Sequence, residues 1–248
     1  MDWSYQLYSS RNAGKSWPEI IKELGKLGYK KVEGFGGVYE EADAVRAALD
    51  EAGMTMPTGH FSIDMLENDF PASDAIAEKL GIKIIACPFI GPDDRPTDAT
   101  GWRNFGARLA KIGTRVEGAG HRFAWHNHHF EFEAVDGTTP MALILQSAPE
   151  IGWEMDLAWV VRGHADPAKW IADHADRIVA VHVKDIAPEG QNADEDGWAD
   201  VGHGTVDWKS LYKLLRDNTP AEHYVMEHDK PSDAARFAKR SIEAASKF

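Results

Sequence analysis

The chain has 248 residues, of which 43% are hydrophobic and 27% are charged, a composition that excludes disordered, collagen-like and coiled-coil proteins. Its 27 Lys and Arg residues against 40 Asp and Glu residues give a formal net charge of −13. A charge of that size and sign repels phosphate backbones and anionic membrane surfaces. We therefore expect neither nucleic acid nor a membrane as a partner.

The features that bear on location point to the cytoplasm. The single cysteine, Cys87, allows no internal disulfide, as is usual in a reducing compartment. The N-terminus lacks the basic and apolar regions of a signal peptide, and no apolar run approaches the roughly 18 residues of a membrane helix. We expect a cytoplasmic protein, and the sequence leaves open whether it forms a homo-oligomer.

Short β-rich runs alternate with longer stretches at helical spacing along the whole chain. In the first helix, Ser16 and Glu19 have the spacing of a capping box, Pro18 lies in the first turn, and Gly28 supplies the stop. In chain order the pattern predicts a strand over 3–8, helix 16–27, strand 31–35, helix 41–52, strand 57–62, helix 71–80, strand 82–90, helix 100–117, strand 122–128, helix 140–146, strand 151–160, helix 167–175, strand 178–186, helix 207–216, strand 223–229 and helix 231–247.

These elements make eight strand–helix units of about 31 residues each, which is the unit size of an α/β (TIM) barrel of about 250 residues. Strict alternation of strand and helix predicts a parallel sheet, and the main alternative is an open, doubly wound sheet. No linker divides the chain, so we predict a single barrel domain over residues 1–248. The one long connection, residues 187–204, is polar and acidic, and we interpret it as a candidate lid loop.

Ionisable residues gather at the carboxyl ends of the predicted strands, the rim of a barrel where catalysis takes place. Residues two apart on a strand share a face, so Glu154 pairs with Asp156. Inward-facing charges of this kind need partners or a metal, and mixed carboxylate and imidazole ligands suit Mn²⁺, Zn²⁺, Co²⁺ or Mg²⁺. The rim residues are Glu33, His60, His126, His128, His129, Glu131, Asp156, His182, Lys184, Asp185, Glu227, His228 and Asp229.

Several segments together resemble the xylose isomerase-like barrel superfamily, in particular its sugar phosphate isomerase/epimerase group. They occur in family order and spacing from the second predicted strand to the eighth. The segments are GYKKVEGFGG (28–37), WHNHHFEF (125–132), IGWEMDLAW (151–159), VHVKDI (181–186), VGHGTVDW (201–208) and VMEHD (225–229).

The resemblance implies a divalent metal near the barrel mouth, with Asp156, His182 and Glu227 as ligands. Many relatives have a glutamate on strand five, where this chain has Trp125 and His126. We expect Glu131 to be the fourth ligand, with His126 or His128 as the substitute. The alternative for this group is a buried ion network that holds no metal.

The resemblance also implies roles for other rim residues. Lys184 resembles the substrate-contacting lysine of the family, and Glu33 and His60 resemble residues that line the sugar pocket. His126 is a further candidate substrate-binding residue. Trp159 could present its ring to a sugar, although core packing is the ordinary role of a tryptophan.

These residues support metal-assisted proton transfer next to a carbonyl group, on a sugar or sugar-derived ketone, through a metal-stabilised enediolate. Glu227 is the first candidate for the base, Glu131 or His128 would act opposite it, and Lys184 would stabilise the oxyanion. The predicted activity is that of an isomerase or epimerase. The enzymatic alternative is a metal-dependent lyase or dehydratase, for example on a 3-keto-glycoside or an inosose, and the non-enzymatic alternative is a carbohydrate-binding barrel.

Overall fold

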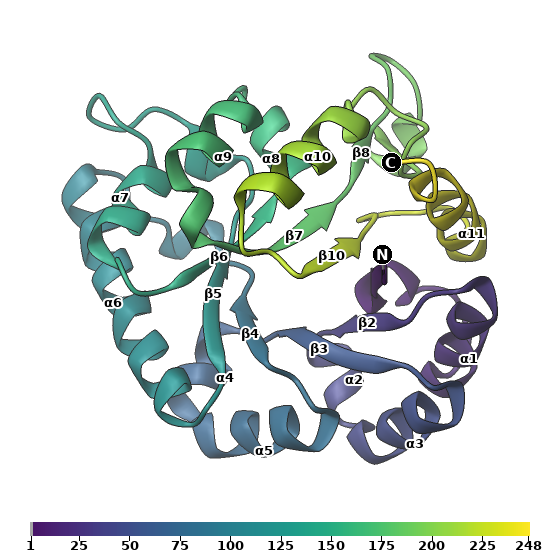
Figure 1. Ribbon diagram of the computed structural model, residues 1–248. Helices are drawn as coiled ribbons and strands as arrows, with labels where there is room; N and C mark the ends of the chain where they lie inside the picture. Colours follow the sequence, from purple (N-terminus) through teal and green to yellow (C-terminus); the bar gives the residue numbers. More distant parts are fainter. Residues whose placement is uncertain (1) are drawn as a thin grey trace.

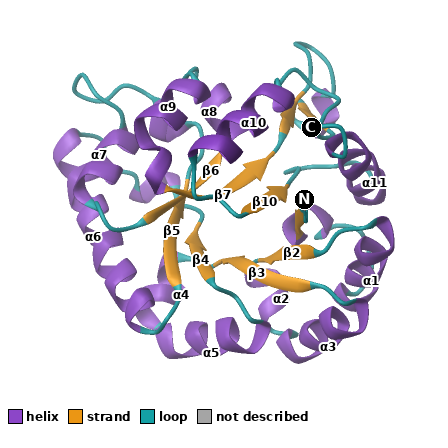
Figure 2. Cartoon of the chain, viewed as in Figure 1, coloured by secondary structure: helices purple, strands orange, loops and turns teal. Residues whose placement is uncertain are grey.

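The computed structural model describes residues 2–248. Eight parallel strands close into a barrel in the order β1-β10-β7-β6-β5-β4-β3-β2, and helices surround it on all sides in the view of Figures 1 and 2. The predicted TIM barrel is thus confirmed, and the open-sheet alternative is excluded. The barrel strands are β1 (Ser4–Gln6), β2 (Lys31–Gly34), β3 (Thr55–His60), β4 (Ile84–Cys87), β5 (Arg122–His126), β6 (Gly152–Asp156), β7 (Ile178–Val183) and β10 (His223–Met226).

The outer layer contains the predicted helices, and short helices follow directly after several strands. None of the helices in residues 2–248 combines the length and the apolar character needed to cross a membrane. The helices are α1 (Trp17–Leu27), α2 (Gly36–Tyr39), α3 (Ala42–Ala52), α4 (Ile63–Asn68), α5 (Phe70–Leu80), α6 (Ala99–Gly118), α7 (Pro140–Ser147), α8 (Leu157–Arg162), α9 (Pro167–His174), α10 (Trp208–Asn218) and α11 (Ala234–Ala245).

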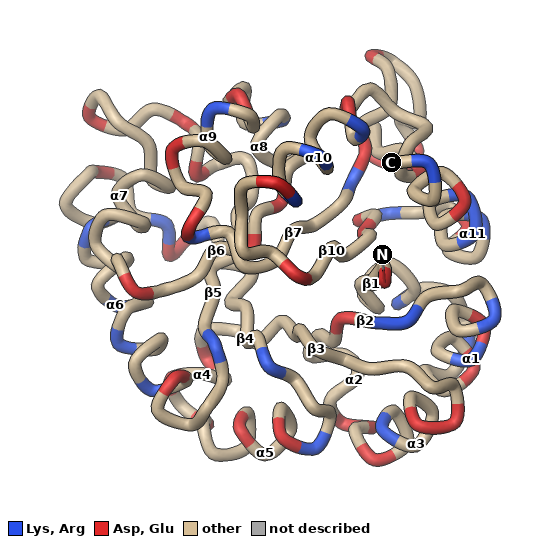
Figure 3. The backbone as a smooth tube through the Cα atoms, in the orientation of Figure 1, with Lys and Arg blue, Asp and Glu red and all other residues tan. Residues whose placement is uncertain are grey.

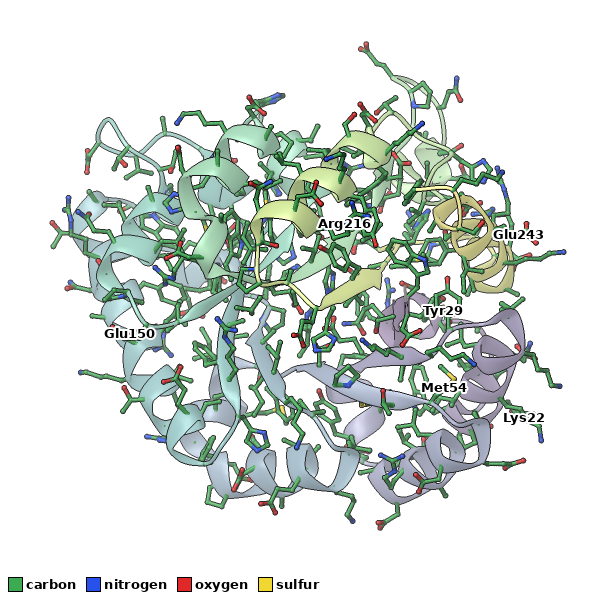
Figure 4. The ribbon with its side chains drawn as sticks, in the orientation of Figure 1. Lys22, Tyr29, Met54, Glu150, Arg216 and Glu243 are labelled. Carbon is green, nitrogen blue, oxygen red and sulfur yellow. The ribbon has the colours of Figure 1, made fainter. Side chains whose placement is uncertain are left out.

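The local signals of α1 act as predicted. Ser16 and Glu19 form the reciprocal capping box, and Gly28 ends the helix at φ 105°, a left-handed conformation in which glycine carries no side-chain penalty. Charged residues are spread over the outer helices (Figure 3). Figure 4 shows Lys22 and Glu243 pointing outward, whereas Met54, 2% exposed, is part of the core between barrel and helices.

Most of the barrel strands are shorter than predicted, and in two of them the structure shows why. Strand 151–160 ends at Asp156, because the Asp156 side chain accepts a hydrogen bond from the Trp159 amide and caps α8. Strand 178–186 ends at Val183, and Asp185–Ile186 forms β8, which pairs antiparallel with β9 (Trp198–Ala199) outside the barrel. Apolar composition alone does not distinguish a strand from a buried helix.

The connection proposed as a lid is folded rather than structureless. Residues 187–204 contain β9 and a short 3₁₀ helix, Ala193–Glu195. The Glu195 carboxylate accepts hydrogen bonds from the Ser232 amide at 2.6 Å and from Arg236 at 2.9 Å. These contacts join the segment to the start of α11.

The alternation of side chains along the strands builds the barrel interior in layers. On β5, Trp125 faces outward and packs edge-to-face on Phe105 of α6, with ring centroids 5.2 Å apart. Ala124 belongs instead to a small buried apolar cluster, which also contains Ala180 of β7. His126 and His182 lie two residues further along these strands and share their faces, so an ionisable layer lies above a floor of small apolar side chains.

Candidate active site

The ionisable side chains form two adjoining groups that share His182. The first, the inner group, comprises Glu33, His60, His126, Glu154 and His182. Register brings them together, since His126 lies opposite Glu154, and Asp156 opposite His182, in neighbouring parallel strands. Each of these side chains is nearly or fully buried.

Short contacts connect the members of the inner group. The Nε2 atom of His182 lies 2.6 Å from Glu33 Oε1, and the Nε2 atom of His60 lies 2.6 Å from Glu154 Oε2. His126 Nδ1 is 3.2 Å from the same Glu154 oxygen. Gln6 donates a hydrogen bond to Glu33 Oε1 at 2.6 Å, so Glu33 is held from two sides.

The outer group surrounds the ammonium of Lys184. Its Nζ atom lies 2.7 Å from Asp229 Oδ1, 3.2 Å from Glu227 Oε2 and 3.4 Å from Asp156 Oδ2. The other ring nitrogen of His182, Nδ1, lies 2.9 Å from Glu227 Oε2. Three carboxylates therefore surround a single ammonium in the outer group.

Protonation in the inner group reflects competition between burial and charge. Burial disfavours a charged imidazole, but the carboxylates of Glu33 and Glu154 outweigh it and raise the pKa values of His60 and His182. Burial and the negative charge of Glu33 raise the pKa of Glu154 to about 7. Burial and the positive charge of His182 lower the pKa of His126.

In the outer group, Glu227 and Asp156 stay ionised near neutral pH although both are buried. Burial would raise the pKa of Glu227, but Lys184 and His182 hold it well below its usual range. Burial raises the pKa of Asp156 to about 6, against the opposing effect of Lys184. Near neutral pH both carboxyl groups are therefore ionised and can accept a proton or bind a cation.

Two tryptophans cover Lys184, Trp198 from the folded connection and Trp159 from α8. The Lys184 Nζ atom lies 4.5 Å from the ring centre of Trp198 and 5.1 Å from that of Trp159, within cation–π range. The two rings pack edge-to-face at 4.7 Å. Lys184 is 1% exposed, so it acts on the pocket through its electrostatic field and through its carboxylate partners.

A pocket of about 490 Å³ opens above these groups. Of the predicted substrate-binding residues, His60 and His126 line it, whereas Glu33 is fully buried and Trp159 packs beside His128 and His129. The full lining is Tyr8, Phe35, Gly36, His60, Ser62, Met65, Pro88, Phe89, His126, His128, Glu227 and Asp229.

The predicted ligands Asp156, His182 and Glu227 fit a divalent metal. Each offers a ligand atom, and these atoms lie within 4.8 Å of one another. The Oδ2 atom of Asp156 is buried and has no hydrogen-bond donor. Two carboxylates and an imidazole suit Mn²⁺, Zn²⁺ or Co²⁺.

Glu131 lies away from these ligands. The chain leaves β5 after His126 and forms a 3₁₀ helix, Phe130–Phe132. The Glu131 carboxyl group receives hydrogen bonds from Trp125 Nε1 at 3.2 Å and from the His128 amide at 2.9 Å, on the outward side of β5. Among the strand-five residues considered, His126 is the one whose ring reaches Asp156, with Nε2 3.9 Å from Oδ2.

Two residues that shape the site, Glu154 and Asn127, are not among the predicted site residues. The alternation along strand six predicts that Glu154 shares the face of Asp156, and this pattern is the signal for its position in the inner group. Asn127 faces the opposite way from His126; its amide oxygen accepts hydrogen bonds from the Asp156 amide at 3.0 Å and from Trp153 Nε1 at 2.8 Å. Nothing in the sequence pattern marked Asn127 as the residue that fixes the end of β6.

Comparisons with known proteins agree with this architecture. The model of a family described as xylose isomerase-like TIM barrel matches residues 21–247. No curated protein matches the sequence.

Three solved structures illustrate the range of proteins with this fold. A sugar phosphate isomerase/epimerase from Parabacteroides distasonis ATCC 8503 is 19% identical, with a TM-score of 0.82 over 98% of this chain and 93% of that one. A 3-keto-D-glucoside 4-epimerase from E. coli is 17% identical, with a TM-score of 0.72 over 100% of both chains. An AP endonuclease of family 2 from Brucella melitensis is 11% identical, with a TM-score of 0.70 over 98% of this chain and 99% of that one.

Proposed function

The chain belongs to the family of xylose isomerase-like TIM barrels, and from this premise we propose that it is a divalent-metal-dependent isomerase or epimerase. Its substrate would be a sugar or sugar-derived ketone, and the reaction would be proton transfer at the carbon next to the carbonyl group. The observation that carries this proposal is Glu227, an ionised carboxylate in the pocket wall that also belongs to the candidate metal group. Two of the similar structures are described as epimerases, which supports the same choice.

Asp156, His182 and Glu227 would hold the metal, with His126 as the strand-five contribution. When bound, the metal would act as a Lewis acid toward the carbonyl oxygen and an adjacent hydroxyl group of the substrate. Glu33 would fix the orientation of His182 through the 2.6 Å contact to Nε2, which leaves Nδ1 directed toward Glu227. A carboxylate behind a ligating histidine is the usual way in which such a ring is positioned.

Glu227 would remove the proton from the substrate carbon, because its low pKa keeps it ionised and its side chain reaches the pocket. His128 lines the same pocket, and burial together with the charge of Lys184 lowers its pKa to about 3. It is therefore a neutral imidazole, which could accept a proton at the other side of the carbon while protonated Glu227 returns one. General acid–base groups of this kind contribute roughly 10²–10⁴-fold each.

Lys184 would keep the negative charge of the outer group from repelling the enediolate that forms. Its ammonium is already in contact with three carboxylates, so no reorganisation is needed when charge develops on the substrate. The two tryptophans exclude water from this ammonium, which strengthens its field.

The experiment that tests the proposal is solvent deuterium exchange into D-fructose, D-xylulose, 3-keto-glucose and 2-keto-myo-inositol, followed by NMR. We expect the wild-type protein to exchange the proton next to the carbonyl group in at least one of them. The Glu227→Gln variant should bind that compound and lose the exchange. Full exchange in the variant would remove Glu227 from the mechanism, and no exchange into any compound by the wild type would contradict the proposed activity.

A further inference from the structure

The pocket is divided into a polar half and an apolar half. The acid–base residues Glu227 and His128 come from the loops after β10 and β5, on one side of the barrel, whereas His60 reaches the pocket from the end of β3. The other side carries an apolar arc, which we define as the lining residues Tyr8, Phe35, Met65, Pro88 and Phe89. Four successive barrel strands, β1 to β4, are followed by the segments that contribute it.

Phe89 stands out within this arc. It is 45% exposed, the single large hydrophobic side chain of residues 2–248 that is exposed to this degree. Its ring meets the ring of His128 edge-to-face, with centroids 5.3 Å apart, so the apolar arc begins directly beside the acid–base half. A single exposed aromatic on a surface needs no explanation, but this one lines a pocket together with four other apolar side chains.

Phe35, one of the aromatic residues of the arc, is held in place by neighbouring rings. Phe35 packs edge-to-face on Tyr8 at 5.4 Å and on Trp17 at 5.6 Å. Rings that are fixed in this way bind an apolar group with little loss of side-chain freedom. The arc is thus suited to a flat or ring-shaped apolar group rather than to water.

The charges around the pocket disfavour a phosphorylated ligand. None of the residues that line it is Lys or Arg, whereas Glu227 and Asp229 are carboxylates. The guanidinium of Arg11 stacks on Tyr8 at 3.7 Å and donates to the Asp229 carbonyl oxygen at 2.6 Å. The guanidinium of Arg95 stacks on Phe130 at 3.5 Å and donates to the Ile90 carbonyl oxygen. Both guanidinium groups therefore already have partners, and neither side chain lines the pocket.

The volume is consistent with a ligand larger than one sugar ring. Pockets that enclose drug-sized molecules measure roughly 300–1,000 Å³, and this one measures about 490 Å³. A monosaccharide over the acid–base half would leave the arc in contact with water. Burial of apolar surface favours a ligand that covers it.

We propose that the pocket binds an uncharged glycoside with a keto group on its sugar ring. The sugar unit lies over Glu227 and His126, while an apolar ring on the aglycone packs on Phe89 and the rest of the apolar arc. This inference rests on the proposed function for the position of the sugar unit. It adds that the substrate carries an apolar substituent and no phosphate.

The test compares the binding of four probes by isothermal calorimetry: the 4-nitrophenyl and methyl β-glycosides of glucose and of galactose. We expect the 4-nitrophenyl compound of at least one pair to bind about ten-fold more tightly than its methyl counterpart, since an aromatic contact contributes about that factor. Glucose 6-phosphate should bind more weakly than methyl glucoside. Equal affinity within both pairs, no measurable binding of either 4-nitrophenyl glycoside, or tighter binding of the phosphate would overturn the proposal.

The Phe89→Ala variant tests whether the apolar arc causes the preference for the 4-nitrophenyl compound. Phe89→Ala should remove most of the preference for the 4-nitrophenyl compound, while its exposed position keeps the effect on stability small. Phe70→Ala, a partly buried aromatic at the start of α5 outside the pocket, is the matched control and should keep the full preference. A preference unchanged in Phe89→Ala would contradict the arc as the binding surface. Binding of the aryl glycosides, together with no deuterium exchange into any of the four keto compounds named above, would support this inference while contradicting the proposed isomerase activity, so the two failures are distinguishable.

Discussion

His182 Nε2 lies 2.6 Å from Glu33 Oε1, and this contact connects the first half of the barrel to the candidate metal group. The two residues come from β7 and β2, which are not neighbours in the barrel. The imidazole therefore spans the interior, with Glu33 at one nitrogen and Glu227 at the other.

The Glu33→Gln variant should weaken metal binding by 10- to 100-fold, because it removes the charge that orients His182. Equilibrium dialysis with Mn²⁺ measures the dissociation constant directly. The exposed Glu117→Gln on α6 is a control of the same chemical change and should bind the metal as the wild type does. An unchanged dissociation constant in a folded Glu33→Gln variant would show that Glu33 does not position His182 for a metal.

Lys184→Met should destabilise the metal-free protein by about 3–5 kcal/mol, because removal of one partner of a buried ionic group leaves uncompensated charges. Urea unfolding measures the change. Lys213 pairs with Asp217 on the surface, where its side chain is 72% exposed, and Lys213→Met should stay within about 0.5 kcal/mol of the wild type. Comparable values for the two variants would mean that the contacts of Lys184 do not stabilise the fold.

The stability of the protein should carry a pH dependence that comes from Glu131. Burial raises the pKa of this carboxyl group from 4.5 to about 8, whereas in the unfolded chain it ionises near 4.5. A raised acid pKa means that the unfolded state releases the proton first, so the contribution of Glu131 to stability falls as the pH rises from 4.5 and levels off above 8.

Replacement of Glu131 by Gln removes this pH-dependent loss of stability, because the amide does not ionise. The stability of Glu131→Gln relative to the wild type should therefore increase between pH 5 and pH 8, by at most about 1.4 kcal/mol per pH unit. Urea unfolding at pH 5, 6.5 and 8 measures it, with the exposed Glu133→Gln as the control. A difference that is constant with pH would show that Glu131 ionises normally in the folded protein.

The sequence predicted the barrel because strand and helix periodicities are local and repeat eight times. It predicted the position of His126, His182 and Glu154 for a related reason: each lies on a strand, where alternation fixes the direction of the side chain. The expected inward cluster at the carboxyl ends of the strands is present in the structure.

Beyond the end of a strand, the alternation of side chains no longer fixes the direction in which a residue points. Glu131 lies five residues after His126, across a turn into a 3₁₀ helix, and its side chain is directed to the Trp125 side of β5. Trp159 lies on α8 rather than on a longer strand six, and it packs on Trp198. The hydrogen bonds of the loops, such as those of Asn127 to Asp156, decide these positions, and they depend on residues far apart in the chain.

The central claim is that proton transfer depends on a divalent metal held by Asp156, His182 and Glu227. Its most direct test is solvent deuterium exchange into the most reactive of the keto sugars, measured on protein treated with a chelator and then supplied with Mn²⁺. The account predicts that chelation abolishes the exchange, that Mn²⁺ restores it in the wild type, and that Mn²⁺ does not restore it in Asp156→Asn. Full exchange in the chelated wild-type protein, with no metal remaining by elemental analysis, would contradict it.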